Sequence, residues 1–147
     1  MACDNLKTSL NGEPACFSSS SSATENGKRF SFQNPNRKPI CKVHVDDCLI
    51  KDHAVKKCDY LFEIDESQYY LVELKGVEIE TAIEQILSTY EIVNKLIKTS
   101  VANYTGIVVS SAVPKAANQK FKNLQEKTYR DKKLIIKRKQ IRYEERI

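Results

Sequence analysis

The chain of 147 residues is long enough for one compact domain and too short for two ordinary ones. Hydrophobic residues make up 41% and charged residues 29%, with four Gly and four Pro, which excludes a fibrous or wholly disordered chain. The net charge of +5 divides into +2 over residues 1–60, −5 over 61–100 and +8 over 101–147. A basic C-terminal third suits a polyanionic partner, although such a run can also be a solvated face.

Residues 1–39 contain a serine run at 18–22 and are predicted to be weakly ordered. A short helix over residues 5–10 is the one regular element considered within them. No stretch approaches the roughly 18 apolar residues of a membrane span, and residues 1–10 lack the apolar run of a signal peptide. Five cysteines, an odd number, then indicate reduced thiols rather than a disulfide framework. We therefore expect a cytoplasmic protein that does not associate with membranes.

Residues 40–147 form the predicted folded domain. Segments 41–50, 56–64 and 68–76 are rich in β-branched and aromatic residues, which predicts three successive antiparallel strands. The second and third are almost continuously apolar, so we expect them to be buried on both faces beneath helices.

A capping box at Thr81–Glu84 and an apolar stripe predict a helix from there to about Lys98. A strand over 104–109, a helix over 114–128 and a strand over 133–137 follow. Helices between the later strands favour parallel crossovers joined to the antiparallel strands. The expected α/β fold is a three-layer α/β/α sandwich with a mixed central sheet.

Two acids are expected to face each other on the second and third strands. If the hairpin pivots on Glu66, residues whose numbers sum to about 132 are opposed, which places Asp59 opposite Glu73. Lys75 points to the same face because side chains alternate along a strand. Two buried carboxylates are unfavourable without a cation, so this pair suits Mg²⁺ (or Mn²⁺). The competing interpretation is a structural ion triad in which Lys75 neutralises both acids.

Asp46 and Asp47 are candidate accessory acids. A first hairpin pivoting near residues 51–53 would bring one of them opposite Asp59, whereas a solvated turn is the simpler interpretation of the other. Gln85, on the predicted helix, is a third candidate accessory residue.

The segments Cys58–Phe62 and Tyr70–Gly76, followed by the helix that carries Gln85, resemble the PD-(D/E)xK nuclease superfamily. The resemblance covers roughly residues 40–110 and implies a restriction-endonuclease-like fold. The sequence departs from the family pattern in three respects. Cys58 stands where the family has proline, the N-terminal helix that carries a further acid is not identified, and no tyrosine stands four residues after Gln85.

Residue by residue, the resemblance implies that Asp59 and Glu73 are the catalytic acids and metal ligands. It implies that Lys75 is the catalytic lysine, and that the backbone carbonyl of Leu74 also contacts the metal. Gln85 corresponds to a glutamine that some branches of the family carry on the following helix.

A zinc site is a further alternative, because cysteines and histidines crowd into eighteen residues at Cys41, His44, Cys48, His53 and Cys58. The C-x2-C spacing that turns a chain around zinc is missing. Small hydrophobic residues and a turn histidine therefore explain this cluster better.

The basic third is the predicted nucleic-acid-binding surface, which would hold phosphates without reading bases. Its candidate residues are Lys115, Lys120, Lys122, Lys127, Arg130, Lys132, Lys133, Lys137, Arg138, Lys139 and Arg142.

Together these features predict a metal-dependent nuclease that hydrolyses phosphodiester bonds of nucleic acid, with DNA favoured over RNA. A homodimer is a further expectation, because one such core offers little surface for gripping a duplex. The alternative is a noncatalytic module that binds nucleic acid or protein on a nuclease-like fold.

Overall fold

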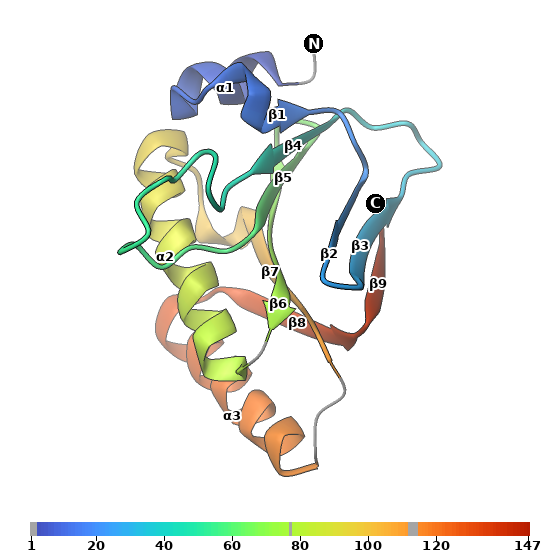
Figure 1. Cartoon of the computed structure of the whole chain (residues 1–147), viewed down its shortest axis with the longest axis vertical. Helices are drawn as coiled ribbons and strands as arrows, with labels where there is room; N and C mark the ends of the chain where they lie inside the picture. The colour runs from blue at the N-terminus through green and yellow to red at the C-terminus, as the bar shows by residue number, and fades with distance from the viewer. Residues whose placement is uncertain (1–2, 77, 112–114) are drawn as a thin grey trace.

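The computed structural model of the chain describes residues 3–76, 78–111 and 115–147, with side chains at all of these except 75, 76, 115 and 116. It contains a six-stranded sheet, a three-stranded sheet and three α-helices (Figure 1). The helices are α1 (Asp4–Leu10), α2 (Ile79–Ile97) and α3 (Lys115–Lys132), and the strands are β1 (Phe17–Ser18), β2 (Ser22–Glu25), β3 (Lys28–Gln33), β4 (Ile40–His44), β5 (Tyr60–Ile64), β6 (Gln68–Gly76), β7 (Tyr104–Ser110), β8 (Ile135–Gln140) and β9 (Arg142–Arg146).

The larger sheet has the strand order β1-β4-β5-β6-β7-β8. Its β4, β5 and β6 pair antiparallel, whereas β6, β7 and β8 pair parallel. The prediction of a mixed sheet, with three antiparallel strands and helical crossovers after them, is confirmed.

Helix α2 begins at Ile79 rather than at Thr81, and its N-cap residue is Glu78, without a side-chain capping hydrogen bond. The predicted capping box at Thr81–Glu84 is therefore wrong, because Thr81 already lies within the first turn. Over the part of the chain that the structure describes, no helix is both long and apolar enough to cross a membrane.

The three helices lie on one side of the larger sheet, which we call the helical face (Figure 1). Leu61, Leu71, Val108 and Ile136 of the sheet contribute to the core on this face, together with residues of α1, α2 and α3. This is the face on which Asp59 and Glu73 lie, since side chains two residues apart on a strand point the same way.

The opposite face is covered by the three-stranded sheet, of order β2-β3-β9 (Figure 1). Phe30 and Phe32 of β3 pack on Phe62 of β5, with ring centroids 5.6 and 5.2 Å apart. Burial of β5 on both faces was expected, but a sheet supplies the cover where the α/β/α prediction placed helices. The alternating pattern of β3 explains this, because it gives one apolar face to the core and one polar face to solvent.

The short helix considered over residues 5–10 is confirmed as α1, whereas the rest of segment 3–39, expected to be weakly ordered, forms β1–β3. Leu6 and Leu10 of α1 and Phe30 of β3 are buried in the two cores. The apolar residues of this segment are few but regularly spaced, so the helix and strands each bury one face against the rest of the chain.

Two disulfides connect this N-terminal segment to β4 and the loop after it. They join Cys3 to Cys41 and Cys16 to Cys48, whereas Cys58 is a free, buried cysteine. The prediction of five reduced thiols is therefore wrong for four of them. The zinc alternative loses two of its candidate ligands, because the sulfurs of Cys41 and Cys48 are bonded to other sulfurs.

Candidate active site

The β5–β6 hairpin has the register predicted from its turn. Tyr60 pairs with Val72 and Leu61 with Leu71, so each described pair sums to 132. Asp59 and Glu73 are the next residues along the two strands, and both are only 2% exposed. Two carboxyl-bearing residues are thus buried together where the β5–β6 ladder ends.

Backbone groups surround Asp59. Its Oδ2 accepts a hydrogen bond from the Leu74 N–H at 2.8 Å, and its own N–H donates to the Val72 carbonyl at 3.1 Å. Its carbonyl oxygen accepts from the Val45 N–H at 2.9 Å. Asp59 is therefore tied to both neighbouring strands, which fixes the direction of its carboxylate.

Glu73 receives a hydrogen bond from helix α2. When the Gln85 carboxamide is oriented with its nitrogen towards β6, that nitrogen donates to Glu73 Oε2 at 2.6 Å and to the Thr81 carbonyl at 3.3 Å. The prediction of Gln85 as an accessory residue thus acquires a direct contact with one of the two acids.

Thr89 occupies the position four residues after Gln85 on helix α2. Its buried hydroxyl donates to the Gln85 carbonyl at 2.9 Å and accepts from the Cys58 N–H at 2.8 Å. Tyr90, the next residue, packs its ring on Tyr104 instead. Thr89 therefore links the turn of α2 that carries Gln85 to the residue before Asp59. A threonine within a helix gives no distinctive signal in the sequence, so Thr89 was not among the predicted residues.

Cys58, the residue before Asp59, is completely buried. Burial raises the pKa of its thiol, and the negative charges of Glu73 and Asp59 raise it further. A hydrogen bond with Thr89 lowers this pKa, but the effect of burial is larger. The thiol is therefore protonated at neutral pH and fills space beside the acids as a small apolar group.

Lys75 follows Leu74 in β6, but its side chain lies outside the described residues, so its predicted role stays a prediction. The pairing of β6 with β7 shifts register between Glu73 and Gly76. This irregularity is placed next to the proposed metal-binding carbonyl of Leu74, and bulges of this kind commonly redirect side chains beside active sites.

Neither Asp46 nor Asp47 stands opposite Asp59. His44 pairs with Tyr60, so the same register places Val45 opposite Asp59. The register centres the first hairpin on residue 52, within the predicted range 51–53. The prediction was wrong only in the residue that it placed opposite Asp59. The Asp46 carboxylate lies 4.0 Å from the Nζ of buried Lys57, while Asp47 has a positive φ of 62° and is exposed.

The predicted basic residues line several different hollows of the structure. Lys122, Lys137, Arg138 and Lys139 line a cavity between α3 and β8, whereas Lys127 and Lys132 line a groove between α2 and α3 that also contains Glu80 and Asp131. Three of the remaining predicted residues have side-chain partners: Lys120 pairs with Glu80, Arg130 lies beside Asp131, and Lys133 lies over the Tyr129 ring. Arg142 lines a third cavity together with Arg29. The side chain of Lys115 lies outside the described residues.

The donor set around Asp59 fits a hard divalent cation better than zinc. Within residues 3–76, 78–111 and 115–147, no group of three or more His, Cys, Asp or Glu side chains is arranged to hold a metal. Two carboxylates and a backbone carbonyl are all oxygen donors, and Mg²⁺ commonly uses one or two carboxylates while retaining water and substrate oxygens.

No protein-family model, curated protein or solved structure matches this chain.

Proposed function

We propose that the protein is a metal-dependent nuclease that hydrolyses phosphodiester bonds of nucleic acid, built on a restriction-endonuclease-like fold with helices on one face. In this proposal, Asp59, Glu73 and the Leu74 carbonyl hold Mg²⁺ or Mn²⁺. Lys75 lies at the scissile phosphate, and Gln85 orients Glu73.

The buried Asp59 and Glu73 pair carries the proposal. Burying two neighbouring carboxylates is costly, and a protein that needed only a stable core could place apolar residues there. Here a backbone N–H orients one acid and an amide of α2 orients the other. Such orientation is what a metal site requires of the groups around its ligands.

A divalent ion bound here supplies a Lewis acid for a phosphoryl oxygen and lowers the pKa of a coordinated water. The chain's own residues then have two tasks. The Leu74 N–H and Gln85 hold the two carboxylates in fixed directions. The Lys75 ammonium offsets the negative charge that develops on the phosphate.

We propose DNA over RNA as the substrate and a homodimer as the form that grips a duplex. The cytoplasmic location expected from the sequence stays a prediction, and the two disulfides weigh against it because cytosolic reductants keep most thiols reduced.

A cleavage assay tests the nuclease proposal. Purified wild type, Glu73→Ala and the control Glu91→Ala are incubated with single- and double-stranded DNA and RNA in Mg²⁺, in Mn²⁺ and in EDTA. Glu91 is an exposed acid of α2. We expect metal-dependent cleavage by wild type and Glu91→Ala, and none by Glu73→Ala. Absence of cleavage by folded wild type on all four substrates would contradict the proposal.

A second candidate is a noncatalytic module that binds nucleic acid, and the depth of the acids favours it. At 2% exposure, Asp59 and Glu73 offer little surface to a phosphate. Thermal unfolding with increasing Mn²⁺ separates the two candidates. A nuclease centre predicts a rise in Tm that disappears in Glu73→Ala, whereas a binding module predicts no metal effect and unchanged oligonucleotide binding in EDTA.

A further inference from the structure

A cavity of about 530 Å³ lies between α3 and the edge strand β8. Four cationic side chains line it, Lys122 from α3 and Lys137, Arg138 and Lys139 from β8, together with the polar groups of Asn118 and Tyr143. We call it the β8 cavity. Its lining includes no Asp or Glu among the described residues, so a binding site for an anion is the simplest chemical interpretation.

Arg138 is held in this cavity by neutral partners. Its Nε donates to Ser110 Oγ at 2.9 Å and its Nη1 donates to Asn118 Oδ1 at 2.7 Å. Its Nη2 is buried and has no hydrogen-bond partner among the described residues. An oriented guanidinium with an unused donor and no carboxylate partner in the described chain is suited to a phosphate oxygen.

Arg138 lies in the same row of the sheet as the candidate metal ligands. Glu73 pairs with Val108 of β7, and Val108 pairs with Arg138 of β8. Residues in register across parallel strands share a face, so Arg138 and Glu73 both lie on the helical face. Neighbouring strands are about 4.8 Å apart, which places their Cα atoms about 10 Å from each other.

The other two cations of β8 extend the site around the open edge of the sheet. Lys137 and Lys139 alternate with Arg138 and therefore lie on the opposite face, where Lys137 pairs with Glu145 at 3.2 Å and Lys139 lies over the Tyr143 ring. Lysines on an edge strand also protect it against aggregation. That role does not account for Arg138, which is oriented towards α3 by Ser110 and Asn118.

We propose that the β8 cavity binds a backbone phosphate of the same nucleic-acid strand that the Asp59 and Glu73 centre cleaves, a few nucleotides from the scissile bond. Arg138 donates its guanidinium N–H groups to the phosphate, and Lys122 supplies a second charge. This inference rests on the proposed nuclease function. It adds a specific position for the substrate backbone along β8.

Fluorescence anisotropy with labelled single- and double-stranded oligonucleotides in EDTA tests this site independently of cleavage. The variants are Arg138→Gln and the control Lys95→Gln, which removes one exposed charge of α2. We expect Arg138→Gln to weaken binding roughly fivefold to tenfold and to lower the slope of log K against log salt by about 1, because one phosphate contact is lost. Lys95→Gln should bind like wild type.

The outcomes distinguish this inference from the nuclease proposal. Weakened binding by Arg138→Gln without any cleavage by wild type would keep the phosphate site and overturn the nuclease. Unchanged affinity and salt slope in Arg138→Gln, with Glu73-dependent cleavage, would overturn the phosphate site alone. No oligonucleotide binding by wild type would overturn both. If Arg138→Gln fails to fold, Lys122→Gln on the exposed surface of α3 is measured instead, and unchanged binding by it overturns the site.

Discussion

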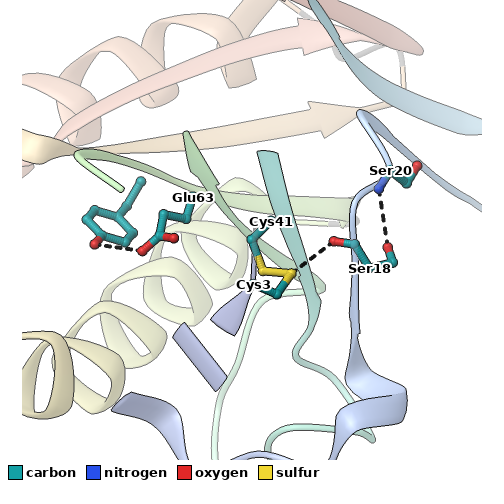
Figure 2. The surroundings of a disulfide bond; sticks show 6 residues. Cys3, Ser18, Ser20, Cys41 and Glu63 are labelled. Atoms are coloured by element: carbon teal, nitrogen blue, oxygen red, sulfur yellow. Dashed lines mark hydrogen bonds between the residues drawn. A yellow bond between two sulfur atoms is a disulfide. The ribbon is translucent and has the colours of Figure 1, made fainter. Parts of the chain in front are cut away.

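Both ends of the β5–β6 hairpin bury carboxyl-bearing residues on the helical face, but their partners differ. At the turn end, Glu63 is 4% exposed and stands opposite Cys41, whose disulfide to Cys3 is drawn in Figure 2. The Tyr69 hydroxyl donates to Glu63 Oε2 at 2.9 Å. The Tyr69 ring stacks on Tyr104, with centroids 5.1 Å apart.

At the open end, Asp59 and Glu73 lie together with a backbone N–H and the Gln85 amide directed at them. A single acid can fold as a neutral group, and burial indeed raises the pKa of Glu63, although the hydrogen bond from Tyr69 lowers it. Two neighbouring carboxylates that both carry charge are a demanding arrangement without a cation beside them. Burial alone therefore does not identify a site, whereas convergence of acids with oriented donors does.

Replacing one carboxylate at a time by an amide, at the open end or at the turn end, is the strongest test of whether the two ends differ in function. We expect Asp59→Asn and Glu73→Gln to lower the cleavage rate at saturating Mg²⁺ by roughly a hundredfold to a thousandfold, since each removes charge that stabilises the transition state. Glu63→Gln, the matched change at the turn end, should cleave within about twofold of wild type. Equal loss in all three variants would show that the two ends do not differ in function.

The disulfide beside Glu63 should govern stability rather than activity. Cys3 and Cys41 are 38 residues apart, and opening a loop of that length costs about 3–4 kcal/mol through the entropy of the unfolded chain. We expect Cys3→Ser/Cys41→Ser to lower the free energy of unfolding by about this amount in urea titrations.

The cleavage rate of this double variant should match wild type at a temperature where both are folded. Wild type under reducing conditions is the control, and it should lose more stability because the Cys16–Cys48 disulfide opens as well. A double variant as stable as oxidised wild type would contradict the structural role of the first disulfide.

Removing one acid from the open end should stabilise the protein when no metal is present. Glu73→Gln keeps an oxygen that can accept from Gln85 and eliminates one of two neighbouring buried charges, so we expect a gain of roughly 1 kcal/mol in EDTA. Urea unfolding with and without Mn²⁺ measures it, and metal should stabilise wild type only.

A structural ion triad makes the opposite prediction. Glu73→Gln would then lose stability in EDTA, and Lys75→Met would unfold more easily without changing any cleavage. Reduced cleavage by a Lys75→Met protein that remains folded would eliminate the triad.

The sequence predicted best what short-range geometry determines. The turn at Glu66 sets the β5–β6 register, which counting predicted as far as the pair Tyr60 and Val72, next to Asp59 and Glu73. The same counting located the first hairpin, but the choice of Asp46 or Asp47 was wrong by one or two positions, since Val45 holds that place.

The elements that the sequence did not predict depend largely on distant partners. Strand β9 forms because it pairs with β3, more than a hundred residues earlier, and disulfide connectivity is not encoded in cysteine spacing. One missed element had a local signal. Asn26 and Gly27 both have positive φ and form a two-residue loop between β2 and β3, which is a strong hairpin signal.

The smallest expected effect is a pH dependence confined to the turn end. A carboxyl whose pKa is raised in the folded state binds its proton more tightly there than in the unfolded chain. The free energy of unfolding of wild type should therefore fall as pH rises from the ordinary range of glutamate through the raised pKa of Glu63, and then level off.

Glu63→Gln cannot titrate, so its stability relative to wild type should increase over the same pH window. Its amide oxygen can still accept from Tyr69, which keeps the comparison close to a pure charge effect. Urea midpoints at pH 4, 6 and 8 measure the difference, with Glu91→Gln as the control for removing one exposed acid. If the curves of Glu63→Gln and wild type stay parallel, the pKa of Glu63 is the same in the folded and unfolded states, and burial at the turn end does not perturb this carboxyl.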